Sequence, residues 1–184
     1  MSTKGSITKC DYLDFDYING VVLKFRKKPK NKLICDYIVI AMNTGLRCSD
    51  VLALSWEQLR EHKLTITEKK TKKKKEIGIN DAIHSIIKKS DSGSPFLNSK
   101  GNIISLRWLN ILLKDVFEKD VKAKKNISTH TLRKSFGRRV YKNNGSTEDA
   151  LIYLSELFNH ADVRTTRKYL GIRQEELNEI YYNL

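Results

Sequence analysis

Most of the chain carries its apolar residues at helical spacing, and only two short runs alternate as strands do. A typical helical stripe runs through residues 33–42 and ends at Gly45. The runs KLTITEK (63–69) and EIGIN (76–80) alternate instead, and the lysine-rich TKKKK joins them. The pattern predicts a mainly α fold with a small antiparallel β-hairpin, an α+β class in which the hairpin tip is basic.

Further helices follow from the same spacing together with capping residues. They are expected from Ser49 past Trp56, from Ala82 to Lys89, from Ser105 to Val121, from Thr129 to Tyr141, from Ser146 to Phe158, around Tyr169, and from Gln174 to the end. No linker-like stretch divides the chain. We therefore expect residues 31–184 to form one domain. Residues 1–30 are expected to be an N-terminal lead-in of uncertain structure.

The charge balance indicates a polyanionic partner. Thirty-five lysines and arginines face 21 acidic residues, which gives a net charge of +14 and favours nucleic acid first and an acidic membrane second. Cys10, Cys35 and Cys48 show no spacing typical of a disulfide framework or a zinc site. No apolar run is long enough to span a bilayer or to act as a signal core, so we expect a cytoplasmic protein without a membrane partner.

Two stretches supply basic groups in positions suited to an anion. In THTLRKSF, His130 and Arg133 share one helix face, and the near neighbours are basic rather than acidic. In TGLRCSD, Arg47 lies in a short link between two apolar helices, where a guanidinium can clamp a phosphate. The alternatives are two exposed polar residues on a basic helix, and an arginine that caps the preceding helix.

The remaining candidates are a lysine run and a tyrosine. EKKTKKKKE is either a solvated hairpin tip or a hairpin that inserts one lysine into a groove. In FNHADVRTTRKYLG, Tyr169 follows several basic residues, and His160 precedes it. A phenol with a pKa near 10 needs cationic neighbours or a base before it can attack a phosphate. The alternative is a core aromatic of a short amphipathic helix.

Taken together, TGLRCSDVLALSW, the lysine before Thr71, HTLR and FNHADVRTTRKYLG resemble, in this order and spacing, the tyrosine recombinases. That family comprises phage integrases, Xer proteins and Cre-like enzymes. The resemblance covers the chain from about Leu33 to its end. It implies the tyrosine recombinase catalytic-domain fold and a site-specific DNA recombinase that needs no metal, cofactor or ATP.

The resemblance also implies a role for each candidate residue. The two arginines on the scissile phosphate are Arg47 and Arg133, the hairpin lysine is Lys70, the two histidines are His130 and His160, and the nucleophile is Tyr169. Lys69 and Lys72 compete for the role of the lysine. Lys70 is preferred because it directly precedes Thr71, as in the Lys-Thr pair of many integrases, and because its distance from Arg47 fits the family.

Three features depart from the family pattern. Asp50 stands where the family often has glutamate, and Asn159 replaces the usual glycine before the second histidine. Asparagine is the residue that best substitutes for glycine at positive φ. The N-terminal core-binding domain that clamps the other side of the DNA is not expected, so the chain resembles either an isolated catalytic domain or a natural short form such as the fimbrial phase-variation invertases.

The implied partner is double-stranded DNA, and the implied assembly is a homo-tetramer on that DNA. The last helix has an apolar stripe formed by Leu177, Ile180, Tyr181 and Leu184, which either docks on a neighbouring protomer or packs on its own core. An accessory DNA-bending or directionality factor and a nucleoid-associated location in a bacterial or phage-infected cell are further expectations. The reaction is integration, excision or inversion for a mobile element. The alternatives are a DNA-binding regulator with the same fold and a type IB topoisomerase.

Overall fold

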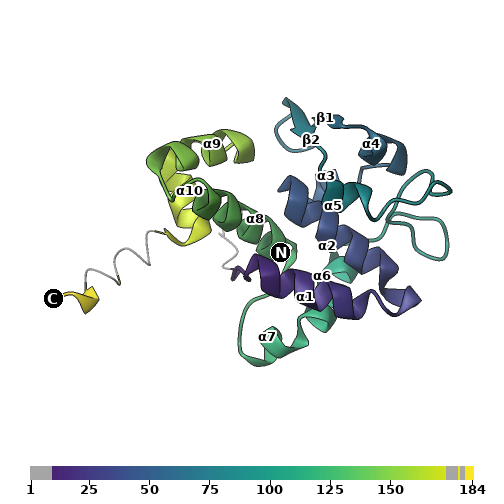
Figure 1. Ribbon diagram of the computed structural model, residues 1–184, viewed down its shortest axis with the longest axis horizontal. Helices are drawn as coiled ribbons and strands as arrows, with labels where there is room; N and C mark the ends of the chain where they lie inside the picture. The colour runs from purple at the N-terminus through teal and green to yellow at the C-terminus, as the bar shows by residue number, and fades with distance from the viewer. Residues whose placement is uncertain (1–9, 173–177, 179–180) are drawn as a thin grey trace.

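A computed structural model describes residues 10–172, 178 and 181–184 of the chain. Within them the fold is mainly helical with a two-stranded antiparallel sheet, as predicted (Figure 1). The elements are α1 (Phe15–Phe25), η1 (Pro29–Asn31), α2 (Lys32–Thr44), α3 (Cys48–Val51), α4 (Trp56–Arg60), β1 (Lys63–Thr67), β2 (Lys74–Gly78), α5 (Asp81–His84), α6 (Leu106–Val116), α7 (Glu118–Lys122), α8 (Thr129–Asn143), α9 (Glu148–Phe158) and α10 (Val163–Leu170).

Helix α2 is the centre of the larger core and ends where its sequence predicts. Gly45 adopts the left-handed conformation with φ +62°, and its N–H caps the carbonyl of Ala41. A Cβ at this position would lie 2.4 Å from the ring of Phe136 on α8. Only glycine therefore allows the chain to turn here while α8 packs closely against the turn, and this turn leads directly to Arg47.

The predicted hairpin is confirmed, although β1 ends at Thr67 rather than Lys69 and β2 begins at Lys74 and ends at Gly78, two positions earlier than expected. Its register pairs Lys63 with Gly78 and Thr67 with Lys74. The turn between the strands is closed by backbone hydrogen bonds from Glu68 N to Lys73 O and from Lys72 N to Glu68 O. This closure holds the lysine-rich turn in one conformation rather than leaving it as a free loop.

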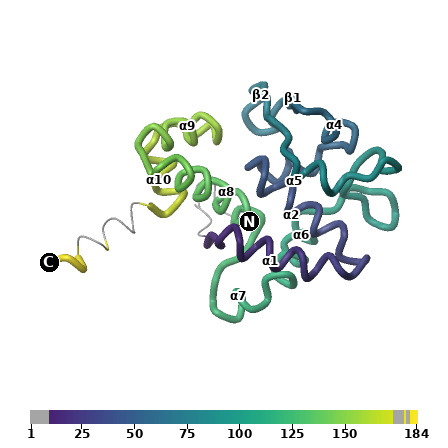
Figure 2. The backbone as a smooth tube through the Cα atoms, viewed as in Figure 1, coloured from purple at the N-terminus to yellow at the C-terminus, as the bar shows by residue number. Residues whose placement is uncertain are grey.

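Two hydrophobic clusters support the molecule, and α8 belongs to both. Leu132 near the start of α8 is part of the larger cluster, to which α2 contributes more buried residues than any other element. Phe136 and Val140 further along α8 pack against a smaller cluster that contains Phe158 of α9 and Leu170 of α10. Figures 1 and 2 both show α8, α9 and α10 grouped at one side of the other elements. The candidate site lies where the two clusters meet.

Several predicted boundaries are corrected at the larger cluster. The helix expected from Ser49 begins at Cys48 and stops at Val51, and Trp56 lies in the separate α4, which Ser55 caps. The helix expected from Ala82 to Lys89 is only the single turn α5. Polar turn-forming residues interrupt both segments, and short helices depend on such local caps.

Other boundaries shift for equally local reasons. The helix expected from Ser105 to Val121 breaks at Phe117, whose φ of −106° and ψ of 36° are not helical. Ser128 and Thr147, rather than Thr129 and Ser146, cap α8 and α9. Residues 15–25 of the lead-in form α1, and Ile18 and Val22 of that helix join the larger core.

The predicted C-terminal helix falls largely outside the described residues. Leu177 and Ile180 of its apolar stripe are not described. Tyr181 is 74% exposed and Leu184 is 96% exposed. Of the stripe, the described residues therefore include only Tyr181 and Leu184, and both are exposed.

Candidate functional site

Two arginines from distant parts of the sequence, Arg47 before α3 and Arg133 on α8, converge on the end of α9. Arg47 Nη2 donates to the carbonyl oxygen of Phe158 at 3.0 Å, and Arg133 Nη2 donates to the same oxygen at 3.1 Å. Arg133 Nη1 also donates to Gly45 O at 2.6 Å, and its guanidinium lies 4.2 Å from the centre of the Phe158 ring. Each guanidinium has about five N–H donors, so both retain donors for an anion.

Burial makes this pair strongly electropositive. Arg133 is 4% exposed, and burial lowers its pKa to about 10, against the opposing effect of Tyr169. It remains a cation at neutral pH. The two guanidiniums, of which Arg133 is buried and Arg47 is partly exposed, share one acceptor and repel each other, and an oxyanion bound between them relieves that repulsion.

Glu68 is a fully buried carboxylate that lies beside Arg47. Its Oε2 accepts hydrogen bonds from Arg47 Nη1 at 2.7 Å, Thr71 Oγ1 at 2.5 Å and Asn159 Nδ2 at 2.8 Å. Burial raises the pKa of Glu68, but the hydrogen bonds from Thr71 and Arg47 together bring it below its usual value. The carboxylate therefore stays ionised and balances one of the two arginines.

The loop after α9 presents the second predicted histidine. Asn159 adopts the left-handed conformation with φ +50°, which ends α9 and turns the chain so that His160 N bonds to Ser155 O. His160 Nδ1 lies 2.9 Å from Thr166 Oγ1. Burial, and then the charges of Arg133 and Arg47, lower the pKa of His160 to about 4, so the ring is neutral at neutral pH.

Tyr169 lies on α10 against the same group. Its ring meets Phe158 edge-on at a centroid distance of 5.6 Å and meets His160 at 5.3 Å. Its hydroxyl is buried, and among the described residues no side chain or backbone group hydrogen-bonds to it with ordinary geometry. Burial raises the pKa of Tyr169 far above its usual value, although Arg133 and Arg47 lie close enough to oppose that rise.

Close helix packing sets the position of α10. A Cβ on Gly137 of α8 would lie 2.6 Å from Leu170 Cδ2 and 2.9 Å from Phe158 Cε2. Because Gly137 has no side chain, Leu170 of α10 and Phe158 of α9 pack directly against the backbone of α8. This contact positions Leu170, the residue that follows the predicted nucleophile Tyr169.

His130 and Lys70 lie at the rim of the cluster rather than inside it. Both are exposed, His130 at the start of α8 and Lys70 in the hairpin turn. Although the residue as a whole is exposed, the surrounding protein partly shields its ring from water. This desolvation, and then the positive charges of Arg133, Lys70 and Arg47, lower the pKa of His130. The two rim residues are thus near enough to interact electrostatically with each other and with both arginines.

Lys75 on β2 is the lysine that enters the cluster. Its Nζ donates to Leu157 O, next to the carbonyl that the two arginines share. Burial, with Arg133 next, lowers the pKa of Lys75 to about 8. Neither Lys75 nor Glu68 was among the residues singled out from the sequence. The alternation of Lys75 with Ile77 and Ile79 on one strand face was the available signal for Lys75.

Asp50, which stands where the family often has glutamate, is 4% exposed, and its Oδ1 accepts a hydrogen bond from Lys69 N at 3.0 Å. Among the described residues, no group of three or more His, Cys, Asp or Glu side chains is placed to hold a metal ion. No helix in the same part of the chain is long and apolar enough to cross a membrane.

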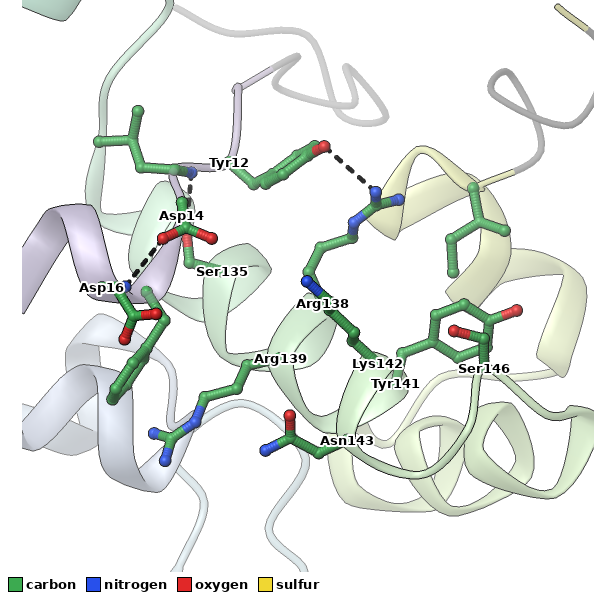
Figure 3. A pocket seen from close by; sticks show the side chains of 13 residues that line it. Tyr12, Asp14, Asp16, Ser135, Arg138, Arg139, Tyr141, Lys142, Asn143 and Ser146 are labelled. Atoms are coloured by element: carbon green, nitrogen blue, oxygen red, sulfur yellow. Dashed lines mark hydrogen bonds between the residues drawn. The ribbon is translucent and has the colours of Figure 1, made fainter. Parts of the chain in front are cut away.

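A separate hollow of about 700 Å³ opens on the other side of α8 (Figure 3). Arg138 and Arg139 of α8 and Tyr12, Asp14 and Ile172 contribute to its lining. Figure 3 shows the Arg138 guanidinium directed to the hydroxyl of Tyr12, at 3.1 Å. This hollow contains none of the six residues predicted from the sequence to form the catalytic site.

A mainly helical domain with one basic hairpin, and with two arginines, a histidine and a tyrosine gathered at one helix end, defines the tyrosine recombinase catalytic-domain class. The chain belongs to the phage integrase family, which it matches over residues 18–176. The match begins within α1 and includes every element of the site.

Curated relatives and solved structures agree with this assignment. The chain is 29% identical over 161 residues to the probable integrase/recombinase YoeC of Bacillus subtilis (strain 168). The matched region covers 83% of this chain and 84% of YoeC. It is 34% identical over 86 residues to the tyrosine recombinase XerC of Pelobacter propionicus, which covers 47% of this chain and 27% of that protein. The chain thus spans most of YoeC but a much smaller part of XerC.

The fold likeness extends over nearly the whole chain. The post-cleavage complex of the XerH site-specific recombinase with palindromic difH substrate matches with a TM-score of 0.67 at 22% identity, covering 93% of this chain and 52% of that chain. The catalytic domain of bacteriophage HP1 integrase matches with a TM-score of 0.57 at 21% identity, covering 89% and 88%. At these identities the likeness concerns the fold.

Proposed function

We propose that this domain cleaves and rejoins double-stranded DNA at a specific site through a 3′-phosphotyrosyl link to Tyr169. One observation carries the proposal. The Tyr169 hydroxyl is buried, and among the described residues no hydrogen bond of ordinary geometry satisfies it, although the Arg133 guanidinium lies close enough to interact with it. Arg133 and Arg47 both retain free donors. A buried, unpaired hydroxyl costs stability, so its retention is best explained by a partner from outside, here a DNA phosphate.

The first step is binding of the scissile phosphate by Arg47 and Arg133. The non-bridging oxygens gain negative charge as the attack proceeds, and two fixed guanidiniums in a desolvated site stabilise that charge. His160 donates a hydrogen bond from Nε2–H to a phosphate oxygen, because Nδ1 is engaged with the Thr166 hydroxyl. The protein contacts of the arginines hold them in place before DNA arrives.

The chemical step forms a bond from Tyr169 Oη to phosphorus and breaks the bond from phosphorus to the 5′ oxygen. The phenol proton leaves as the attack proceeds, with His130, which is neutral at neutral pH, assisting its transfer. The departing 5′ oxygen takes a proton from Lys70 on the hairpin turn. The phosphodiester energy is kept in the tyrosyl link, so the reverse attack by a 5′ hydroxyl rejoins DNA without ATP or metal.

The assembly and setting proposed for the reaction follow the sequence expectations. The proposed species is a homo-tetramer on DNA, coupled through the C-terminal helix and assisted by a DNA-bending or directionality factor, in the bacterial cytoplasm at the nucleoid. The net charge of +14 supports tight, salt-dependent contact with the duplex backbone. Chemical cross-linking on and off DNA tests the tetramer.

The decisive experiment uses a nicked duplex that carries a candidate site, taken from inverted repeats that flank the gene. The nick lets the short cleaved end diffuse away, so the covalent complex accumulates and runs slowly on a denaturing gel. We expect an adduct with the wild-type protein and none with Tyr169→Phe. Specific binding without any adduct would indicate a regulator, and relaxation of plasmid without strand exchange would indicate a topoisomerase.

A further inference from the structure

Resting on the function proposed above, we propose that Glu68 is a positioning residue that locks Arg47, the hairpin turn bearing Lys70 and the loop bearing His160 into one arrangement. Glu68 follows the inward-facing Leu64 and Ile66 of β1 and is itself fully buried. Its alternation with these residues indicates a buried position, but two of its partners, Arg47 and Asn159, are distant along the chain.

Three chain segments meet at one oxygen of this carboxylate. Oε2 accepts from the guanidinium of Arg47 before α3, the hydroxyl of Thr71 in the hairpin turn and the amide of Asn159 after α9. Hydrogen bonds to a charged acceptor are stronger than neutral ones, and in a buried site they are not screened. Removing the charge therefore weakens all three connections at once.

The hairpin turn is held on both sides of Lys70. Thr71 bonds to Glu68, and the backbone N–H of Lys69 donates to Asp50 at 3.0 Å. Lys70 lies between these two anchored residues, so its backbone position depends on two buried carboxylates. The exposed side chain of Lys70 thus extends from a turn that these two hydrogen bonds hold.

The same contact accounts for the asparagine that stands in place of the family's usual glycine. Asn159 tolerates the left-handed conformation and, unlike glycine, brings an amide that donates to Glu68 at 2.8 Å. The hydrogen bond fixes the residue directly before His160. Glu68 and Asn159 thus form a pair whose substitutions we expect to be coupled.

The test compares Glu68→Gln with Glu76→Gln in the full chain. Glu76 lies on the same hairpin and is exposed, with an ion pair to Lys63, so this control makes the same charge change outside the site. Three quantities are measured: the single-turnover rate of adduct formation at saturating nicked DNA, the Kd for that DNA, and hydrogen exchange of peptides that cover residues 68–73 and 158–160.

We expect Glu68→Gln to slow adduct formation by about 10- to 100-fold while the Kd changes by less than about threefold, because misplacement affects the transition state more than binding. Exchange should rise in both peptides together, and Glu76→Gln should change neither. Loss of rate and affinity in equal proportion, or exchange confined to one peptide, would overturn the proposal.

A second pair of variants covers the case in which Glu68→Gln fails to fold. Thr71→Val and Asn159→Gly each remove one donor and leave the Arg47 pair intact, and glycine suits the backbone at 159. Each should slow cleavage at saturating DNA. Thr71→Val should also raise exchange at residues 158–160, and Asn159→Gly should raise it at residues 68–73, although each of these segments keeps its own bond to Glu68. If both variants behave as the wild type, Glu68 is not a positioning residue.

The exchange measurement also separates this inference from the proposed function. If no adduct forms on any DNA but exchange at the two peptides remains coupled through Glu68, the recombinase function fails and the positioning role stands. If Tyr169-dependent adducts form at the same rate with Glu68→Gln, the function stands and the positioning role fails.

Discussion

Arg47 and Arg133 share one acceptor, the carbonyl oxygen of Phe158, at 3.0 and 3.1 Å. This carbonyl is at the C-terminal end of α9, where the helix dipole and unsatisfied carbonyls favour positive charge. The shared contact orders both arginines before any DNA is present. A site that is already arranged needs little reorganisation, and therefore little free energy, to stabilise a transition state.

We expect Arg47→Lys to reduce the single-turnover rate of adduct formation by about 10²- to 10³-fold. Lysine keeps the charge but cannot bond to Glu68 and Phe158 while also contacting a phosphate. DNA affinity at matched salt should change much less, as a filter-binding assay would measure. Arg107→Lys on an exposed position of α6 provides the control. A wild-type rate for Arg47→Lys would remove Arg47 from the site.

Lys70 and Lys75 should respond differently to a better leaving group. In DNA with a bridging 5′ sulfur at the scissile phosphate, the departing thiolate needs no proton, so loss of the general acid is bypassed. We expect this substrate to restore cleavage by Lys70→Ala but not by Lys75→Ala, because Lys75 is bonded to Leu157 O. Lys74→Ala, exposed on the same strand, should behave as the wild type. Rescue of Lys75→Ala alone would assign the acid to Lys75.

Tyr169→Phe should abolish adduct formation and at the same time stabilise the protein. The variant removes a buried hydroxyl that has no hydrogen-bond partner among the described residues, which relieves about 1 kcal/mol or more of desolvation cost. For a domain of this size, a rise in Tm of about 2–4 °C is expected per kcal/mol. Differential scanning calorimetry measures it. A fall in Tm would mean that the hydroxyl supports the fold rather than the chemistry.

Stability should decline on acidification below neutral pH, partly through His160. Its pKa is lowered from 6.5 to about 4 in the folded protein, so between these values the unfolded chain binds the proton and the folded chain does not. The contribution is therefore complete above pH 6.5 and is lost as the pH falls toward 4. Urea unfolding at several pH values should show a shallower slope for His160→Gln than for the wild type. His84→Gln on α5 is the matched control.

Gly137→Ala should displace the nucleophile without touching its chemistry. The new Cβ would lie 2.6 Å from Leu170, and overpacking of this kind costs about 1–3 kcal/mol. Cleavage should fall more than DNA affinity. Gly20→Ala on α1 is the control, since nothing lies within 4 Å of a Cβ there, and it should leave stability unchanged or raise it. Equal effects of the two variants would contradict the packing role of Gly137.

The sequence predicts those parts of the fold that depend on local signals. The stop of α2 at Gly45 and the pairing of the two alternating runs are confirmed because a positive φ and a period of two are local properties. The break at Phe117 was missed because the apolar spacing continues through it, and tertiary packing overrides the pattern.

The candidate site is less local, and its contacts were accordingly less predictable. The family resemblance placed six residues in one site. The structure brings Arg47, Arg133, His160 and Tyr169 together, and His130 and Lys70 lie exposed at the rim. Glu68 escaped notice because its meaning comes from segments far apart in the chain. Its alternation with Leu64 and Ile66 indicates a buried position, but it does not reveal the partners.

The junction of the two hydrophobic clusters has a consequence for molecules in which only one of them loosens. Arg47 directly follows Leu46 of the larger cluster, whereas Tyr169 packs on the smaller one, and α8 contributes to both. Loosening of the smaller cluster alone would therefore move Tyr169 and leave Arg47 in place. For a domain whose proposed reaction breaks DNA, the expected consequence is that a partly opened molecule still binds DNA through its basic groups but does not cleave it.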